Sequence, residues 1–121
     1  MNKLYYLASP YSKYPYGKKE AFKTICKKAA QLMEEGHNIF CPIAHSHPIE
    51  ELGMTKVQNG DFWLKQDFAI LDCCDELWVY KMPGWEDSYG ISKEIERANW
   101  EGIPIKFLEW EGEQLELYDV S

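Results

Sequence analysis

The sequence predicts an α/β domain with three layers, α/β/α, in which helices cover both faces of a mainly parallel sheet of four to five strands. Short apolar runs with strand character alternate along the chain with segments whose apolar residues recur at the three-four spacing of an amphipathic helix. One such run is followed by a Pro-Gly break and then by residues 87–94, which open a helix. That succession is typical of the place where open α/β sheets bind ligands.

Strands are predicted where turn residues bound an apolar run. Ser9 and Pro10 end the first run, and Pro42 ends the second. Parallel pairing through right-handed crossovers predicts the order 2-1-3-4 of a flavodoxin-like sheet, with a crevice at the carboxyl ends of the first and third strands. Polar and apolar residues alternate within the tail, residues 109–121, which is either an edge strand or a subunit contact. The four predicted strands are residues 3–8, 38–41, 76–80 and 103–108.

Three helices are predicted between these strands. The first contains the periodic stretch 22–33 and ends at Gly36. The second spans residues 61–73, with Asp61 as its N-cap. The third runs from the 87–94 motif to about residue 101, before Gly102. Residues 43–60 show no helical period and are predicted as a loop with a short turn at 49–52.

Composition limits the class of protein. The 121 residues suit one soluble domain, with 45% hydrophobic and 27% charged residues. A net charge of −7 argues against a nucleic-acid polymer or an anionic membrane as partner. The apolar run at residues 4–8 is too short for a signal peptide, so we expect a cytoplasmic protein with four reduced cysteines.

The 87–94 motif has the features of an anion site beside a carboxylate. Asp87 and Ser88 are both good N-cap residues, and Gly90 lets a ligand approach the backbone. The first amide groups of a helix lack intrahelical partners and favour an anion. Glu94 follows Ser88 by six residues, about one and a half turns. The alternative is that these residues only cap a helix and that Glu94 is solvated.

Asp67 on the second predicted helix is the candidate partner of Glu94. Its neighbour Phe68 lies on the buried face, so Asp67 can enter the crevice. Two carboxylates suit glycosidic chemistry, in which one stabilises or attacks the anomeric carbon and another group manages the proton of the leaving group. A surface salt bridge to a lysine is the alternative reading of Asp67.

The loops at this end of the sheet add aromatic and histidine side chains. Tyr11 and Trp85 are the rings best placed to stack on a planar base, while Ser9 belongs to the turn that faces the 87–94 motif. His45 and His47 follow Cys41 in a Cys-x3-His-x-His pattern, for which no fourth ligand stands at an expected spacing. We therefore expect a polar pocket loop in which His45 touches substrate, and no metal or other cofactor.

Taken together, the segments 6–10, 67–77, 88–94 and 102–104 resemble the nucleoside 2-deoxyribosyltransferase superfamily, in particular its DUF1937-like branch and the pyrimidine-nucleotide N-glycosidases. The likeness extends from residue 4 to about residue 108. It implies a flavodoxin-like fold, cleavage of a nucleoside N-glycosidic bond and a homodimer or larger homo-oligomer whose subunits complete one another's sites.

The resemblance also implies roles for individual residues. Glu94 matches the nucleophile that forms a glycosyl-enzyme, and Asp67 matches an aspartate that orients the substrate and handles protons. Transferases of the family carry an aspartate six residues before the nucleophile, whereas this chain has Ser88, as the nucleoside 5′-monophosphate hydrolases do. The arginine that some of those hydrolases carry in the first turn is absent, so nearby lysines would have to help with phosphate. These are Lys13, Lys18 and Lys19.

The expected activity is hydrolysis of the base–sugar bond of a nucleoside or deoxynucleoside 5′-monophosphate. Two alternatives remain open: transfer of deoxyribose between bases, and a module that binds a nucleotide without cleaving it. A second base added to the reaction separates hydrolysis from transfer, because only a transferase makes a new nucleoside.

Overall fold

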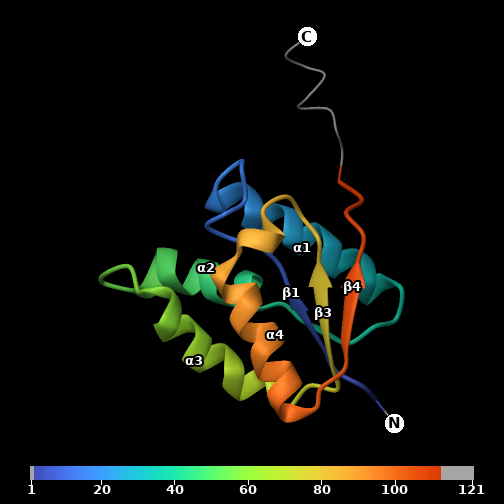
Figure 1. Ribbon diagram of the computed structural model, residues 1–121. Helices are drawn as coiled ribbons and strands as arrows, with labels where there is room; N and C mark the ends of the chain where they lie inside the picture. The colour runs from blue at the N-terminus through green and yellow to red at the C-terminus, as the bar shows by residue number, and fades with distance from the viewer. Residues whose placement is uncertain (1, 113–121) are drawn as a thin grey trace.

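β1 (Tyr5–Ala8) and β3 (Glu76–Tyr80) form the centre of a parallel sheet with helices on both faces (Figure 1). The computed structural model describes residues 2–112, so residues 113–121 of the tail, for which an edge strand or a subunit contact is expected, lie outside the described residues. The remaining elements are α1 (Lys18–Glu34), β2 (Ile39–Phe40), α2 (Pro42–Gly53), α3 (Gly60–Leu71), the 3₁₀ turn η1 (Trp85–Asp87), α4 (Tyr89–Glu101) and β4 (Ile105–Leu108).

The sheet has the order β2-β1-β3-β4, and every pair is parallel. Tyr6 of β1 is in register with Leu77 of β3, which in turn is in register with Ile105 of β4. This confirms the predicted order and the three-layer α/β/α class. The carboxyl ends of β1 and β3 therefore meet at one edge of the sheet, where the predicted crevice belongs.

Alternation along β1 divides the core into two halves. Leu7 faces α1, whose buried residues Ala21, Ile25 and Ala29 recur every four positions. Tyr6 and Ala8 face the other side, where α3 and α4 pack. Tyr6 thereby points from a central strand toward α4, the helix that carries Glu94.

The loop prediction for residues 43–60 is wrong, because most of this segment is α2. Pro42 occupies the first turn, where its missing N–H leaves no acceptor unpaired. Pro48 lies inside the helix and removes one internal hydrogen bond, which is the reason that the sequence favoured a loop. The predicted cap of the next helix also changes: the Asn59 side chain accepts from the amide of Phe62, 2.9 Å away.

The predicted ends of α4 are confirmed. The Ser88 side chain accepts from the amide of Ile91 at its start, and Gly102 adopts a left-handed conformation after its end. Gly84, before η1, also has a positive φ, of 93°. A Cβ there would lie 2.2 Å from the carbonyl oxygen of Lys13, so the loop after β3 crosses the loop after β1 at backbone distance.

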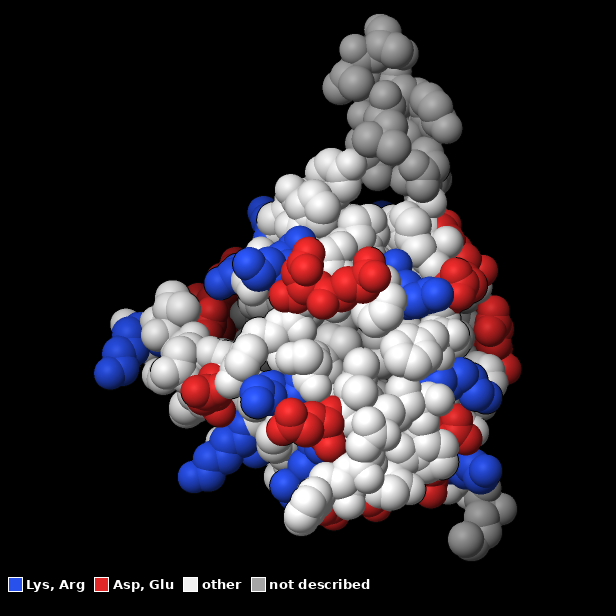
Figure 2. Space-filling view, in the orientation of Figure 1, with Lys and Arg blue, Asp and Glu red and all other residues white. Residues whose placement is uncertain are grey.

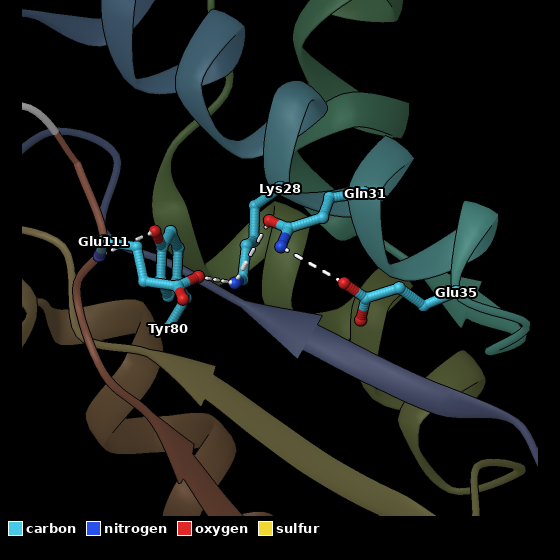
Figure 3. A network of polar contacts seen from close by, with 5 residues as sticks. All are labelled: Lys28, Gln31, Glu35, Tyr80 and Glu111. Atoms are coloured by element: carbon cyan, nitrogen blue, oxygen red, sulfur yellow. Dashed lines mark hydrogen bonds and ion pairs between the residues drawn. The ribbon is translucent and has the colours of Figure 1, made fainter.

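The segment after β4 is tied back to α1 by polar contacts (Figure 3). Lys28 pairs with Glu111, and the amide of Glu111 donates to the Tyr80 hydroxyl at 3.1 Å. Gln31 accepts from Lys28 and donates to Glu35. Acidic and basic side chains are interspersed over the face seen in Figure 2. Within residues 2–112, no helix is long and apolar enough to cross a membrane.

Candidate active site

A cavity of about 200 Å³ lies where the turn after β1 meets the first turns of α2 and α4. The turn supplies Ser9 and Tyr11, α3 supplies Asp67, and the start of α4 supplies Ser88 and Gly90. All five were predicted from the sequence as site residues, and the fold brings them to one cavity. Lys18, Ser46, His47, Glu50 and Trp63 complete much of its wall.

Ser88 is 8% exposed; it caps α4 and also lines the cavity. Its Oγ accepts from the amide of Ile91 at 3.2 Å, which leaves the hydroxyl proton free to donate elsewhere. The amides of Tyr89 and Gly90 belong to the first helical turn and have no intrahelical acceptor. This edge of the cavity is thus rich in donors.

Glu94 is a buried residue of α4 and is not among the residues that line the cavity. Its side chain is enclosed, with 5% of the residue exposed, and the Tyr6 hydroxyl donates to its Oε2. Burial raises the pKa of Glu94 to about 8, and the negative charge of Asp67 adds to this, while the Tyr6 hydrogen bond opposes it. Burial, together with Glu94 and Asp67, also keeps the pKa of Tyr6 well above its usual value.

Asp67 forms part of the cavity wall and is 7% exposed. Burial raises its pKa to about 7, so it titrates near neutrality. The negative charge of Asp67 raises the pKa of both Glu94 and Tyr6, so the two carboxyl groups interact electrostatically. Two buried carboxyls with raised pKa values, next to a cavity, are typical of acid–base sites.

Ser9 directly follows β1 and has a buried hydroxyl at the cavity. Among residues 2–112 its Oγ has no hydrogen-bond partner, and the residue is 6% exposed. A buried hydroxyl without a partner is unfavourable by roughly 1–3 kcal/mol. A polar ligand in the adjoining cavity is a candidate partner for this hydroxyl.

Tyr11, from the turn after β1, and His47, from α2, form a second polar pair in the cavity wall. The Tyr11 hydroxyl lies 2.5 Å from His47 Nδ1, and His47 Nε2 lies 2.9 Å from a carboxylate oxygen of Glu51. Phe22 stacks on the imidazole, with ring centroids 4.2 Å apart. Burial raises the pKa of Tyr11, and the charges of Glu50 and Glu51 add to this.

Four predicted site residues are not among those that line the cavity: Glu94, His45, Trp85 and Asp87. His45 packs against the Phe40 ring. It points away from His47, which lines the cavity, because residues two apart on a helix point in nearly opposite directions. Trp85 packs against Phe107 and the core between the sheet and α4, and Asp87 is exposed in η1. His47, rather than His45, is the histidine that lines the cavity.

The sequence analysis missed the contributions of Tyr6, His47 and Glu50. The Tyr6 hydroxyl reaches Glu94 across 88 positions of the chain, which no local pattern reveals. Glu50 accepts from the Trp63 indole at 2.9 Å and from the amide of Gln58 at 3.3 Å. A helical reading of 42–53 would have separated His47 and Glu50 from His45.

The predicted absence of a metal site concerned Cys41, His45 and His47. In the part of the chain that the structure describes, no three His, Cys, Asp or Glu side chains converge as metal ligands. The Cys41 thiol is buried, and burial raises its pKa to about 12. It is therefore a neutral core side chain.

The fold is that of a deoxyribosyltransferase. A solved structure of 2-deoxyribosyltransferase from the psychrotolerant bacterium Bacillus psychrosaccharolyticus matches with a TM-score of 0.57 and 21% sequence identity, over 96% of this chain and 80% of that one. The family model described as a domain of unknown function, DUF1937, matches residues 3–110, and the chain belongs to this family. No curated protein matches the sequence. The family model thus confirms the expected DUF1937 membership, and the structural match confirms the expected fold.

Proposed function

We propose that the protein is an enzyme that cleaves the N-glycosidic bond of a nucleoside or deoxynucleoside 5′-monophosphate, with Glu94 as nucleophile. The observation that carries the proposal is the pair of buried carboxyls, Glu94 and Asp67, beside a cavity at the carboxyl ends of β1 and β3. The fold supports this chemistry, since a structure of the same architecture bears the name 2-deoxyribosyltransferase.

In the proposed first step, a carboxylate oxygen of Glu94 bonds to the anomeric carbon while the carbon–nitrogen bond breaks. The bonding electrons leave with the base, which takes up a proton, and a glycosyl-enzyme ester remains. Glu94 must be ionised, and the oxygen that Tyr6 does not hold must reach the anomeric carbon. The positive charge that develops on the sugar favours the ionised form, which offsets the effect of burial.

In the second step, water attacks the anomeric carbon and releases Glu94. Asp67 is the group on the cavity wall that can accept the proton of this water, because its pKa of about 7 allows both protonation states near neutral pH. Tyr6 is the positioning residue in this scheme. Its hydroxyl holds one oxygen of Glu94, which leaves the other oxygen for attack.

The donor-rich start of α4 supports a phosphate on the substrate. Ser88 and the amides of Tyr89 and Gly90 face the same cavity as Lys18 from α1. A carboxylate in place of Ser88 would repel a phosphate. Lys18 lies over the Tyr11 ring, with its ammonium 5.4 Å from the ring centroid, and is the cation that the cavity wall offers.

Transfer of the sugar to a second base is the other candidate activity. The name of the structural relative favours it, because that protein is a transferase. Hydrolysis and transfer share the glycosyl-enzyme and differ only in the molecule that attacks it. The cavity of about 200 Å³ must then admit an acceptor base after the first base has left.

The test measures free base, separated by chromatography, from ribo- and deoxynucleoside 5′-monophosphates and from the unphosphorylated nucleosides. We expect release from a monophosphate and its loss in Glu94→Gln. Glu96→Gln is the matched control, because Glu96 is exposed on the same helix. A new nucleoside formed after addition of a second base would identify transfer.

Two results would contradict the proposal. Full activity of Glu94→Gln would exclude Glu94 as nucleophile. Absence of release from every substrate, with or without an acceptor base, combined with a thermal shift by one of them, would leave a nucleotide-binding module.

A further inference from the structure

Tyr11, His47 and Glu51 form a continuous chain from the cavity to the surface. The hydroxyl of Tyr11 and the Nδ1 of His47 are 2.5 Å apart, and the Nε2 of His47 is 2.9 Å from Glu51. Tyr11 and His47 both line the cavity. The Glu51 side chain is 62% exposed, whereas that of His47 is 11% exposed. These three adjacent groups connect the cavity with bulk water.

The imidazole is fixed in this chain by more than its two hydrogen bonds. Phe22 stacks on it with an angle of 17° between the ring planes. The interaction with Glu51 joins positions i and i+4 of α2, so the helix itself sets the distance between the two groups. A carboxylate that orients a histidine, which in turn contacts a hydroxyl, is the general layout of proton-transfer sites.

The protonation state of His47 decides what Tyr11 offers to the cavity. With one proton, on Nε2, the ring donates to Glu51 and accepts the Tyr11 proton at Nδ1. With two protons, the ring donates at both nitrogens, so the Tyr11 hydroxyl accepts from Nδ1 and directs its own proton away from His47. Burial and the charges of Glu50 and Glu51 hold the pKa of Tyr11 above its usual value, which keeps the phenol protonated.

We infer that Tyr11 is a catalytic residue that donates a proton to the departing base, and that His47 and Glu51 supply this proton. The inference rests on the proposed function and adds to it the proton source of the first step. The other charged groups near the chain are Lys18, beside the Tyr11 ring, and Glu50, on the cavity wall.

The protons balance as follows in the first step. The base leaves with the electron pair of the carbon–nitrogen bond and takes the Tyr11 proton on a ring nitrogen or carbonyl oxygen. His47 passes its Nδ1 proton to the Tyr11 oxygen and becomes neutral, while its Nε2 proton stays with Glu51. After the base leaves, water in the cavity gives a proton to the Tyr11 oxygen as the Tyr11 hydroxyl proton returns to Nδ1, and Asp67 passes the proton of the attacking water to solvent.

The experiment separates proton donation from binding. Tyr11→Phe, His47→Gln and Glu51→Gln are each made in the active enzyme and, for binding, in the Glu94→Gln background. We expect kcat for base release to fall about 100-fold or more in Tyr11→Phe, because general acid catalysis contributes 10²–10⁴-fold. The Kd of the uncleaved monophosphate in the Glu94→Gln background should change less than about threefold. The free energy of such a change is small beside the one that corresponds to the expected fall in kcat.

Two further readouts distinguish a proton donor from a structural contact. A fluorinated base leaves more readily without a proton, so its release should lose less in Tyr11→Phe than release of the parent base. The ¹⁵N spectrum of His47 should show hydrogen bonds at both ring nitrogens in the wild type and the loss of one in each neighbouring variant. Tyr16→Phe and His37→Gln, outside the cavity, are the matched controls.

Each outcome decides the inference. A selective fall in kcat with reduced loss for the fluorinated base supports it. Equal losses of kcat for both bases, or a loss of Kd as large as the loss of kcat/KM, overturn it while leaving Glu94 and the proposed function intact. If the wild-type protein releases no base from any substrate, the proposed function fails and this inference fails with it.

Discussion

Glu94 and Asp67 are carboxylic acids that the fold encloses without a cationic partner among the described residues that contact them. Burial is the main cause of the raised pKa of each, about 8 for Glu94 and about 7 for Asp67. Tyr6 supplies a hydrogen bond to Glu94 but no positive charge. Each group is therefore stable in the folded protein as a neutral acid and unfavourable as an anion.

The first prediction follows from this burial and concerns stability against pH. The folded pKa of Glu94 lies above its ordinary value of 4.5, so the folded protein holds a proton that the unfolded chain releases. The contribution of Glu94 to the free energy of unfolding is most favourable below pH 4.5 and is lost as pH rises to about 8. The loss is on the order of a few kcal/mol, since one pKa unit corresponds to about 1.4 kcal/mol.

Thermal and urea denaturation at pH 5.5 and pH 8 measure this effect. Glu94→Gln should be more stable than the wild type at pH 8 and should lose much of the pH dependence. Asp67→Asn should remove the part that develops between pH 4 and about 7. An unchanged difference between the two pH values in both variants would contradict the burial of ionisable groups described here.

At the residue scale, the sequence was informative where function depends on local spacing. Ser88 caps α4 as predicted, and Ser88, Gly90 and Asp67 reach one cavity because helix starts and strand ends are readable from the chain. The partner of Glu94 was not predictable, since Tyr6 reaches it only after β1 and α4 pack together. The roles of these residues in catalysis stay predictions.

At the element scale, α4 contains Gly90, which lines the cavity. We expect a side chain at this position to affect ligand binding more than folding. A Cβ at Gly90 would contact only the Ser88 hydroxyl among nearby groups, at an ordinary 3.8 Å. Gly90→Ala should thus fold and gain up to about 1 kcal/mol of helix propensity. The added methyl stands at the donor-rich edge of the cavity, so the affinity for a monophosphate should fall about tenfold.

Calorimetric titration with the monophosphate that the activity panel identifies, together with thermal denaturation, tests this second prediction. Gly53→Ala is the control, because it also changes a helical glycine with open space around it. Equal affinities of Gly90→Ala and the wild type would show that the ligand does not approach this part of the backbone.

The third prediction concerns the crossing of two loops. Gly84→Ala should lower the free energy of unfolding by about 2–4 kcal/mol, because it adds left-handed backbone strain and pushes against the Lys13 carbonyl. Gly102→Ala carries the strain alone, since nothing lies within 4 Å of its Cβ position. Urea denaturation compares the two variants, and equal losses would mean that the crossing contributes nothing.

α2 is the element that the sequence analysis missed, and the reason is physical. Pro48 removes a helical hydrogen bond, and the segment has little apolar periodicity, so local propensity opposes the helix. Packing against α1 and the sheet overrides this preference, as the buried Ile43 indicates. Because a predicted loop does not indicate which side chains share a face, the sequence analysis expected His45 at the cavity, whereas His47 lines it.

On the scale of the whole molecule, the fourth prediction is self-association through α3 and α4. Trp100 is 83% exposed on α4, where it borders a surface depression together with Phe68 of α3. Tryptophan is enriched at protein interfaces relative to the rest of the protein surface. We expect at least a dimer by light scattering after gel filtration and a monomer for Trp100→Glu.

Leu52→Glu provides the control for this prediction, since Leu52 is 84% exposed on α2, away from that depression. A monomeric wild-type protein, or a Trp100→Glu variant with the wild-type mass, would exclude α4 as the interface. A dimer dissociated only by Leu52→Glu would place the interface at α2.

The architecture as a whole was predictable because apolar periodicity and turn residues agree over most of the chain. Once four strands and their intervening helices are located, the right-handed crossover rule limits the possible strand orders, and the flavodoxin-like order 2-1-3-4 was the one expected. The sheet order β2-β1-β3-β4 and the three layers were obtained in this way. The crossing of Gly84 over Lys13 was not, because contacts between loops depend on the final placement of both strands.

The enclosed acids also bear on how this protein can evolve. Glu94 and Asp67 weaken the fold near neutral pH, and a lineage without need of them would replace them by neutral residues. A random library screened for heat resistance alone should therefore be enriched in changes at these two positions. Such a screen would locate the two enclosed acids without any knowledge of a substrate.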